Sequence, residues 1–181
     1  ELARTHVPIQ GDIRANAAVK SALQNRRAKL RDIDILVNNP GLALGLESAD
    51  KTDWADWLQM IDTNCTALAY LTRLVVVGMV ERRRGHIINV GSVAGHYAYP
   101  GGNVYGASKA FVEQFSRGLR ADLAGHKIRV THIAPGLAGG SEFSQVRFHG
   151  DEQKAQAVYE NTQPLMPADI AECVDWVIHL P

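Results

Sequence analysis

The chain has 181 residues, a length typical of one domain, and 46% of them are hydrophobic, which is enough for a substantial core. Its 19 Lys and Arg residues balance 19 Asp and Glu residues, and this neutrality argues against a nucleic-acid partner. We see no apolar run of about 18 residues, no signal peptide and no metal-site spacing around Cys65 and Cys173. We therefore expect a single cytoplasmic domain over residues 1–181, with reduced cysteines, no membrane contact and no metal.

Short aliphatic runs along the chain predict strands at residues 6–10, 33–38, 85–90 and 128–134. Near-continuous aliphatic runs are typical of strands that are buried on both faces of a parallel sheet. Between the runs, apolar residues at helical spacing predict helices over residues 15–30, 54–79 and 104–123. This alternation predicts an α/β fold, a Rossmann-like doubly wound parallel sheet, whose ligands bind at the carboxyl ends of the strands.

Small or polar residues follow each predicted strand, as a shared cleft requires. The four stretches are Gly11-Asp12-Ile13, Asn38-Asn39-Pro40-Gly41, Gly91-Ser92 and Pro135-Gly136. The sequence therefore places candidate ligand contacts at one edge of the sheet.

Tyr105 and Lys109 are four residues apart on a predicted helix, so they share one face. A phenol has an ordinary pKa of about 10, and an ammonium about 4 Å away contributes roughly 4 kcal/mol at an effective dielectric of about 20. That is about three pKa units, which would bring the phenol near neutrality, where a general acid–base works best. The pair is a candidate proton donor and acceptor, and Ser92 could hydrogen-bond the substrate oxygen.

These residues resemble the signature of the short-chain dehydrogenase/reductase family. Ser92, Tyr105 and the YGASK stretch with Lys109 resemble its Ser–Tyr–Lys set, and NNPG resembles its NNAG turn. Asn64, within DTNCTAL, matches the family's fourth active-site residue. The resemblance covers essentially the whole chain. The stretches NNPGLALG, MVERRRGHIINVGS, YPGGNVYGASKAFV and APGLAGGSEFSQVRFHGD resemble the NADP-dependent 3-hydroxy acid dehydrogenases in particular.

The resemblance implies roles for these side chains. Tyr105 exchanges a proton with the substrate oxygen, Ser92 holds that oxygen, and Lys109 lowers the pKa of Tyr105 and holds the nicotinamide ribose. Asn64 positions a water that relays the proton. The substrates implied are serine, allo-threonine, 3-hydroxypropionate and related 3-hydroxy acids, with malonic semialdehyde in the reductive direction.

The resemblance also implies a nicotinamide cofactor, NADP with NAD as the alternative. Its expected contacts follow the strands and the catalytic helix: Asp12, Ile13, Asn39, Gly41, Tyr105, Lys109, Pro135, Gly136, Leu137, Ala138, Gly139, Gly140, Ser141, Glu142 and Phe143.

Two departures from the family pattern stand out. Pro40 replaces the usual Ala, so one backbone N–H is missing, which would weaken cofactor binding modestly. The family's glycine-rich TGxxxGxG loop and the residue that selects NADP or NAD precede Glu1 in the family order, and the last strand follows Pro181. We therefore expect a sheet truncated at both ends, with open strand edges and little activity from this stretch alone.

Arg147 could bind the carboxylate of a 3-hydroxy acid with its guanidinium, or it could be an exposed loop arginine.

A 3-oxoacyl-carrier-protein reductase, or another short-chain reductase, is an alternative function of the same class. A non-catalytic interaction protein is an alternative of a different class. The family resemblance further implies a homotetramer built partly on the two long helices.

Overall fold

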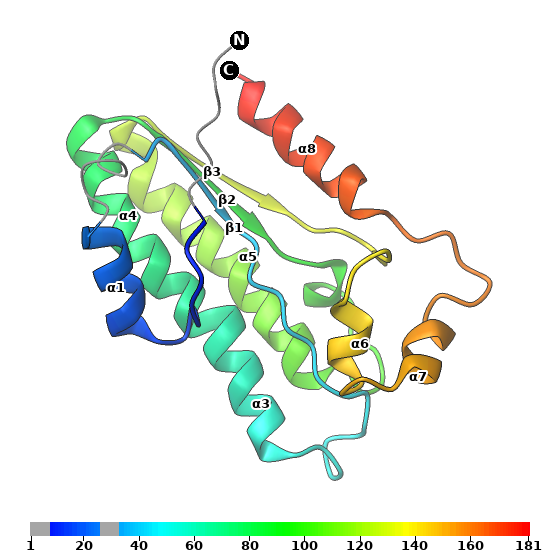
Figure 1. Cartoon of the computed structure of the whole chain (residues 1–181). Coiled ribbons are helices and arrows are strands. Elements are labelled where there is room, and N and C mark those ends of the chain that lie inside the picture. Colours follow the sequence, from blue (N-terminus) through cyan, green and yellow to red (C-terminus); the bar gives the residue numbers. More distant parts are fainter. Residues whose placement is uncertain (1–7, 26–32) are drawn as a thin grey trace.

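The computed structural model describes residues 8–25 and 33–181. At its centre is a sheet of three parallel strands (Figure 1). In spatial order they are β1 (Ile35–Asn38), β2 (Gly85–Val90) and β3 (Ile128–Ile133). Asn38 lies opposite Asn89, and Val90 lies opposite Ile133. The carboxyl ends of the strands therefore meet at one edge, and the strands predicted at 33–38, 85–90 and 128–134 are confirmed.

The prediction for the start of the chain is partly wrong. Residues 8–10 form no strand, and residues 6–7 of the expected strand lie outside the described residues. The expected helix over 15–30 is confirmed as α1 (Asn16–Asn25), and residues 26–32 lie outside the described part. Pro8 lacks the N–H that pairing with a neighbouring strand requires, which accounts for part of the failure.

One continuous helix runs from Trp54 to Arg82. It consists of α3 (Trp54–Ile61), a π-helical segment (Asp62–Ala67) and α4 (Leu68–Arg82). Asp53 caps its start by accepting a hydrogen bond from the backbone of Ala55 at 2.9 Å. The later part of the predicted apolar stripe packs inward, because Leu68, Val75 and Met79 are buried. Its first part does not, since Trp54, Leu58 and Ile61 are exposed.

The same helix corrects our expectation about apolar runs. Its 29 residues are long and apolar enough to cross a membrane, by length and composition, with a mean hydropathy of 1.4 over its most apolar window. Its apolar residues have a use within the fold, since Val75 and Met79 pack with Leu36 and Ile87 of the sheet in one core cluster. Burial against the sheet therefore accounts for part of the apolar composition of this helix, of whose most apolar window 33% is buried.

Helices cover both faces of the sheet, which makes the fold doubly wound (Figure 1). The long helix and α5 (Asn103–Leu123) lie on one face, and α8 (Pro167–His179) lies on the other. Between β3 and α8 the chain forms α6 (Phe143–Arg147) and α7 (Glu152–Ala157) near the carboxyl ends of the strands. The short 3-10 turns are Val93–Gly95 and Ala124–His126.

A row of buried polar side chains crosses the sheet beneath the long helix and α5. The Asn38 amide donates to Asn89 Oδ1 at 2.8 Å and to the Thr72 hydroxyl at 2.9 Å. Asn89 in turn donates to the Ser116 hydroxyl at 2.8 Å. These hydrogen bonds link β1 and β2 to both covering helices just below the carboxyl edge.

The outer edge of β1 has no partner strand among the residues that the structure describes. Ile35 and Val37, which point to the α8 face, are 42% and 41% exposed.

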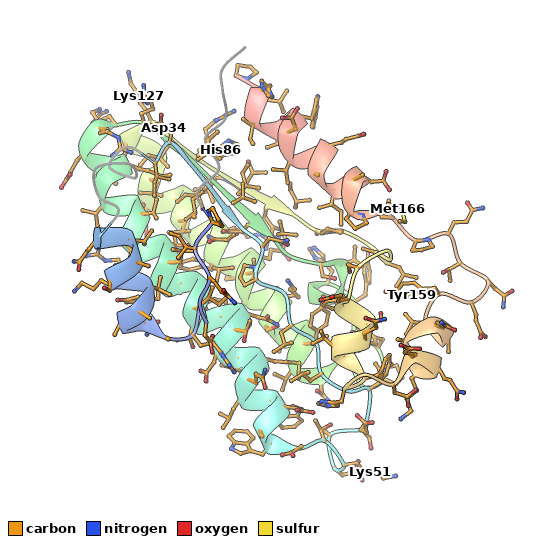
Figure 2. The ribbon with its side chains drawn as sticks, in the orientation of Figure 1. Asp34, Lys51, His86, Lys127, Tyr159 and Met166 are labelled. Carbon is orange, nitrogen blue, oxygen red and sulfur yellow. The ribbon has the colours of Figure 1, made fainter. Side chains whose placement is uncertain are left out.

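His86 on β2 gives the fold a testable pH dependence (Figure 2). The side chain is 3% exposed, one ring nitrogen lies 2.8 Å from the Thr131 hydroxyl, and burial lowers its pKa from 6.5 to about 4. Between pH 4 and 6.5 the unfolded chain therefore binds more protons than the folded one, so stability falls as the pH drops through this window. We expect the free energy of unfolding to decrease by about 2 kcal/mol between pH 7 and pH 5 through this group.

Urea unfolding at both pH values, with wild type and His86→Gln, measures this contribution. The His86→Gln variant should lose most of the pH dependence, whereas His179→Gln, at a side chain that is 73% exposed, should keep it. Equal pH dependence in wild type and His86→Gln would assign the effect to other groups.

Candidate active site

A cavity of about 770 Å³ opens at the carboxyl ends of the strands. Its wall contains residues from three of the four predicted strand-end stretches: Asn39 and Gly41, Gly91 and Ser92, and Pro135 and Gly136. Cavities of this size are typical of sites for small molecules and cofactors. The shared cleft expected from the sequence is therefore present for these three stretches.

Backbone hydrogen bonds continue beyond β2 and β3 and fix the floor of the cavity. Gly91 donates to the Ile133 carbonyl at 2.7 Å, and Val93 donates to the Pro135 carbonyl at 3.0 Å. A side chain at Gly91 would not fit, because its Cβ would lie 2.0 Å from Nε2 of His132. Ser92 begins the following turn, and its hydroxyl accepts a hydrogen bond from the Ala94 backbone at 3.1 Å.

Tyr105 and Lys109 lie one turn apart on α5, and both line the cavity as predicted. Ser92 lines the same cavity, and its hydroxyl lowers the pKa of the Tyr105 phenol in part. Lys109 is 3% exposed, and its Nζ donates to the carbonyls of Val90 at 3.2 Å and Pro40 at 3.4 Å. Pro40 thus contributes a carbonyl at the position where it lacks an N–H.

The expected lowering of the Tyr105 pKa by Lys109 is wrong for this structure. The Lys109 Nζ lies 5.9 Å from the centroid of the Tyr105 ring. Burial raises the pKa of Tyr105, and the hydrogen bond with Ser92 and the charge of Arg147 offset only part of the rise. Burial also lowers the pKa of Lys109 to about 8. The sequence argument assumed a short, solvated pair, whereas burial acts on both groups and favours the neutral form of each.

Asn64 lies in the π-helical segment and is fully buried. Its amide donates to the Leu42 carbonyl at 2.8 Å and to the Ser108 hydroxyl at 2.9 Å, and its oxygen accepts from the Leu42 backbone at 2.9 Å. Asn64 does not line the cavity, although Leu42 does. Asn64 thus lies behind Leu42 and Ser108, in a π-helical interruption of the kind that frequently marks functional segments.

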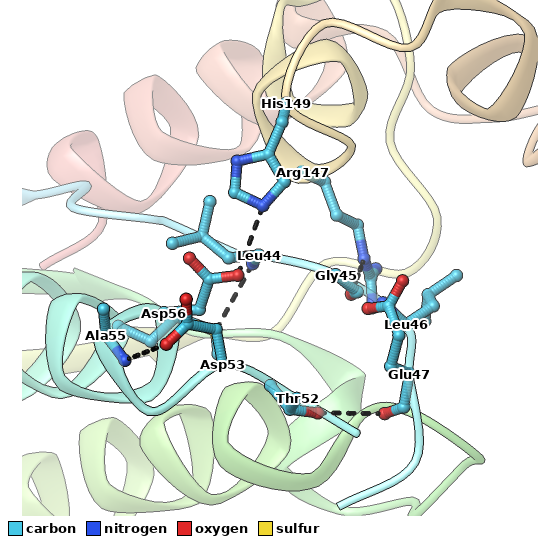
Figure 3. A network of polar contacts seen from close by, with 11 residues as sticks. Leu44, Gly45, Leu46, Glu47, Thr52, Asp53, Ala55, Asp56, Arg147 and His149 are labelled. Atoms are coloured by element: carbon cyan, nitrogen blue, oxygen red, sulfur yellow. Dashed lines mark hydrogen bonds and ion pairs between the residues drawn. The ribbon is translucent and has the colours of Figure 1, made fainter.

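Arg147 is not an exposed loop residue. It ends α6, is 8% exposed and lines the cavity. Its guanidinium carbon lies 5.7 Å from the centroid of the Tyr105 ring. Nε donates to the Gly45 carbonyl at 3.1 Å, and the Gly45 backbone donates to the Arg147 carbonyl at 2.8 Å (Figure 3). A buried cation is therefore held beside the phenol.

The predicted cofactor residues divide into two groups. The segment after β3 reaches the cavity, where the lining residues are Pro135, Gly136, Leu137, Ala138, Gly139, Ser141, Glu142 and Phe143. Gly140, with φ +67°, belongs to the same loop but does not line the cavity. Asp12 and Ile13 lie away from it: both are exposed, and Asp12 forms an ion pair with Arg14 at 2.7 Å.

The sequence did not identify Tyr99 and Tyr159 as site residues, although both line the cavity. Tyr159, labelled in Figure 2, contacts the Ser144 hydroxyl at 2.6 Å and donates to the Ala138 carbonyl at 3.1 Å. No local sequence pattern predicts that Tyr159 lines the cavity, because the chain returns to the cavity only after α6 and α7. Tyr99 does have a signal, the YPGG stretch that contains it.

Comparison with known proteins agrees with this geometry. The family model described as short chain dehydrogenase matches residues 1–151. The chain belongs to the short-chain dehydrogenases. It is therefore an oxidoreductase of that family, and its Rossmann-like fold is the family's own.

Relatives within the short-chain dehydrogenases include the NADP-dependent 3-hydroxy acid dehydrogenase YdfG of Salmonella typhi, which is 58% identical over 181 residues and covers 100% of this chain and 73% of the relative. Sulfoacetaldehyde reductase 2 of Chromohalobacter salexigens is 45% identical, covering 98% of this chain and 70% of the relative. The closed form of serine dehydrogenase complexed with NADP+ superimposes with a TM-score of 0.93 at 57% identity, covering 96% of this chain and 70% of that structure.

Proposed function

We propose that this short-chain dehydrogenase interconverts 3-hydroxy acids and their 3-oxo acids or semialdehydes with NADP. The observation that carries the proposal is the pairing of a proton donor and an anion-binding cation on one cavity wall. The Tyr105 ring and the Arg147 guanidinium lie 5.7 Å apart there. Relatives named as 3-hydroxy acid and serine dehydrogenases support the same substrate class.

The volume of the cavity and its lining, which includes Gly41 and Gly136, support the binding of a nicotinamide cofactor. No atom lies within 4 Å of the place where a Gly136 Cβ would be, so the turn after β3 leaves its space open to a ligand. A Gly41 Cβ would lie 3.6 Å from the Lys109 Nζ, so Gly41 lies directly beside that cation. Lys109, Asn39, Gly41 and the loop after β3 would hold the cofactor, which supplies the hydride acceptor or donor.

Tyr105 is the proposed general acid–base. Because burial raises the pKa of Tyr105, the phenol carries its proton near neutrality and can donate it to a carbonyl oxygen during reduction. Ser92, on the wall of the same cavity, would hold the same oxygen.

Asn64 is proposed as the residue that fixes this arrangement from behind. Its three hydrogen bonds join Leu42 on the cavity wall to Ser108, whose hydroxyl donates to the Tyr105 carbonyl at 2.7 Å. The water relay that the resemblance implies for Asn64 remains a prediction.

Arg147 would bind the acid group of the substrate. Arginine binds carboxylates through parallel N–H groups, and a buried guanidinium gains more from an anion than an exposed one. The name sulfoacetaldehyde reductase indicates that this relative also acts on a compound with an anionic end, a sulfonate. An anion-binding arginine would serve both kinds of substrate.

We expect Arg147→Ala, in the complete gene product, to raise the KM for 3-hydroxypropionate about thirtyfold or more, since an anion would lose its buried partner. The uncharged 3-hydroxypropionamide should be turned over with little change, which also shows that the variant is folded. Steady-state kinetics with NADP measure both effects. Arg117→Ala, at a side chain that is 62% exposed on α5, is the matched control.

An equal loss with the acid and the amide would contradict the role of Arg147 and favour the alternative of a 3-oxoacyl-carrier-protein reductase or another short-chain reductase. If the folded protein shows no NADP-dependent turnover, the hypothesis to test next is that it is a non-catalytic interaction protein.

We extend the proposal to a cytoplasmic homotetramer, as the family resemblance implies. Exposed apolar side chains on α3 and α5, Trp54, Leu58, Ile61 and Phe111, would form part of the contact between copies. The mass in solution, from sedimentation, decides this point.

A further inference from the structure

We propose that Tyr99, on the YPGG turn at residues 99–102, is a positioning residue that makes the site selective for acid substrates by fixing the guanidinium of Arg147. This inference rests on the proposed function, because it assigns a second residue to the recognition of the acid group. Tyr99 lines the cavity, and the YPGG stretch has no other assigned part in the site.

Tyr99 contacts Arg147 in two ways. Its hydroxyl accepts a hydrogen bond from Nη2 at 3.2 Å, and its ring centroid lies 5.8 Å from the guanidinium carbon. The Tyr105 ring lies at 5.7 Å from the same carbon. Two aromatic rings and one hydroxyl therefore constrain the plane of the guanidinium, and cation–π contacts of this kind are worth more where water is excluded.

A second anchor comes from the loop after β1. Nε donates to the Gly45 carbonyl at 3.1 Å (Figure 3). The two anchors engage Nε and Nη2, while Nη1 has no hydrogen-bond partner among the residues that the structure describes. The N–H groups that remain are those needed for a carboxylate or a sulfonate. Because the Arg147 guanidinium is already held in place, less conformational entropy is lost when the anion binds.

The turn that carries Tyr99 is built around its two glycines. The Gly102 backbone donates to the Tyr99 carbonyl at 3.0 Å, and a Gly102 Cβ would lie 2.5 Å from Cζ of the Tyr99 ring. Gly101 has φ +75°, and its Cβ would lie 2.1 Å from the Leu46 carbonyl oxygen. Glycine at both positions lets the ring pack on the turn and lets the turn pack on the loop of Gly45.

The test is Tyr99→Phe in the complete gene product, with NADP, 3-hydroxypropionate and 3-hydroxypropionamide. The change removes the hydroxyl and keeps the ring, so we expect the KM for the acid to rise about threefold to tenfold with kcat nearly unchanged. The kinetics of the amide should not change. Tyr97→Phe, two residues earlier at a side chain that is 73% exposed, is the matched control and should leave both substrates unaffected.

The double variant Tyr99→Phe with Arg147→Ala separates this inference from the proposed function. If Tyr99 acts through Arg147, its substitution should have no further effect on the acid once Arg147 is gone. Independent, additive effects would overturn the inference, and so would an unchanged KM in Tyr99→Phe alongside a raised KM in Arg147→Ala. An unchanged KM in Arg147→Ala itself would instead remove the proposed role of Arg147.

Discussion

We expect Tyr105→Phe to lower kcat for 3-hydroxypropionate about a thousandfold, because the phenol is the group placed to exchange a proton with the substrate oxygen. The substitution keeps the ring, and with it the contact of ring centroids at 5.9 Å with Phe143. Cofactor binding, measured by fluorescence titration with NADPH, should therefore persist. Steady-state kinetics across pH 6–10 measure the loss.

Tyr97→Phe is a suitable control for this variant, since Tyr97 lies outside the cavity wall. Turnover by Tyr105→Phe within tenfold of wild type would assign the proton transfer to another group. A loss of NADPH binding together with activity would point to a structural role for the phenol instead.

The second large effect is expected for Lys109→Met, which should reduce kcat/KM about a hundredfold without reducing stability. Lys109 is 3% exposed, and its pKa of about 8 means that burying the charge works against folding. The unfolded chain binds more protons than the folded one between pH 8 and 10.5, so the stability of the wild type gains about 3 kcal/mol across that window from this group. A methionine of similar length has no such cost.

Two measurements check the Lys109 prediction together. The free energy of unfolding of Lys109→Met should equal or exceed that of wild type at pH 7, and the rise with pH above 8 should be missing. Lys127→Met, at an exposed side chain between the 3-10 turn Ala124–His126 and β3, should alter neither property. If Lys109→Met unfolds readily at pH 7, Lys109 stabilises the fold, and the prediction that it serves catalysis at a cost in stability is wrong.

Local patterns in the sequence were sufficient for most of the fold. The strands at 33–38 and 85–90 were predicted from near-continuous aliphatic runs, and the helices from apolar spacing, because burial on a sheet imposes both patterns directly. Residues 8–10 were mistaken for strand, since a short apolar run with a proline does not establish pairing. The π-helical segment around Asn64 was not predicted, because only the packing of Leu42 and Ser108 against Asn64 reveals it.

The site divides in the same way. Ser92, Tyr105 and Lys109 were found because they follow a strand or share one helix face, and the structure places all three on the cavity wall. The burial of Arg147 and its contact with Tyr99 depend on loops that meet only in three dimensions. The pKa of Tyr105 could not be derived from spacing, because it depends on how much water surrounds the phenol.

The amide row across the sheet has a consequence for the accuracy of folding. The aliphatic runs of β1 and β2 are alike, so apolar burial alone would tolerate a slip of two residues between them. In the observed register the Asn38 amide reaches Asn89 at 2.8 Å, whereas a slip of two would set Asn38 beside Ile87. An unpaired polar group in the interior costs about 1–3 kcal/mol, and a slip would leave the Asn89 Oδ1 without the donor that it has in the observed register. Misaligned sheets are thereby penalised before any ligand arrives, and the glycines and polar residues beyond the strand ends reach the cavity together only in the correct alignment.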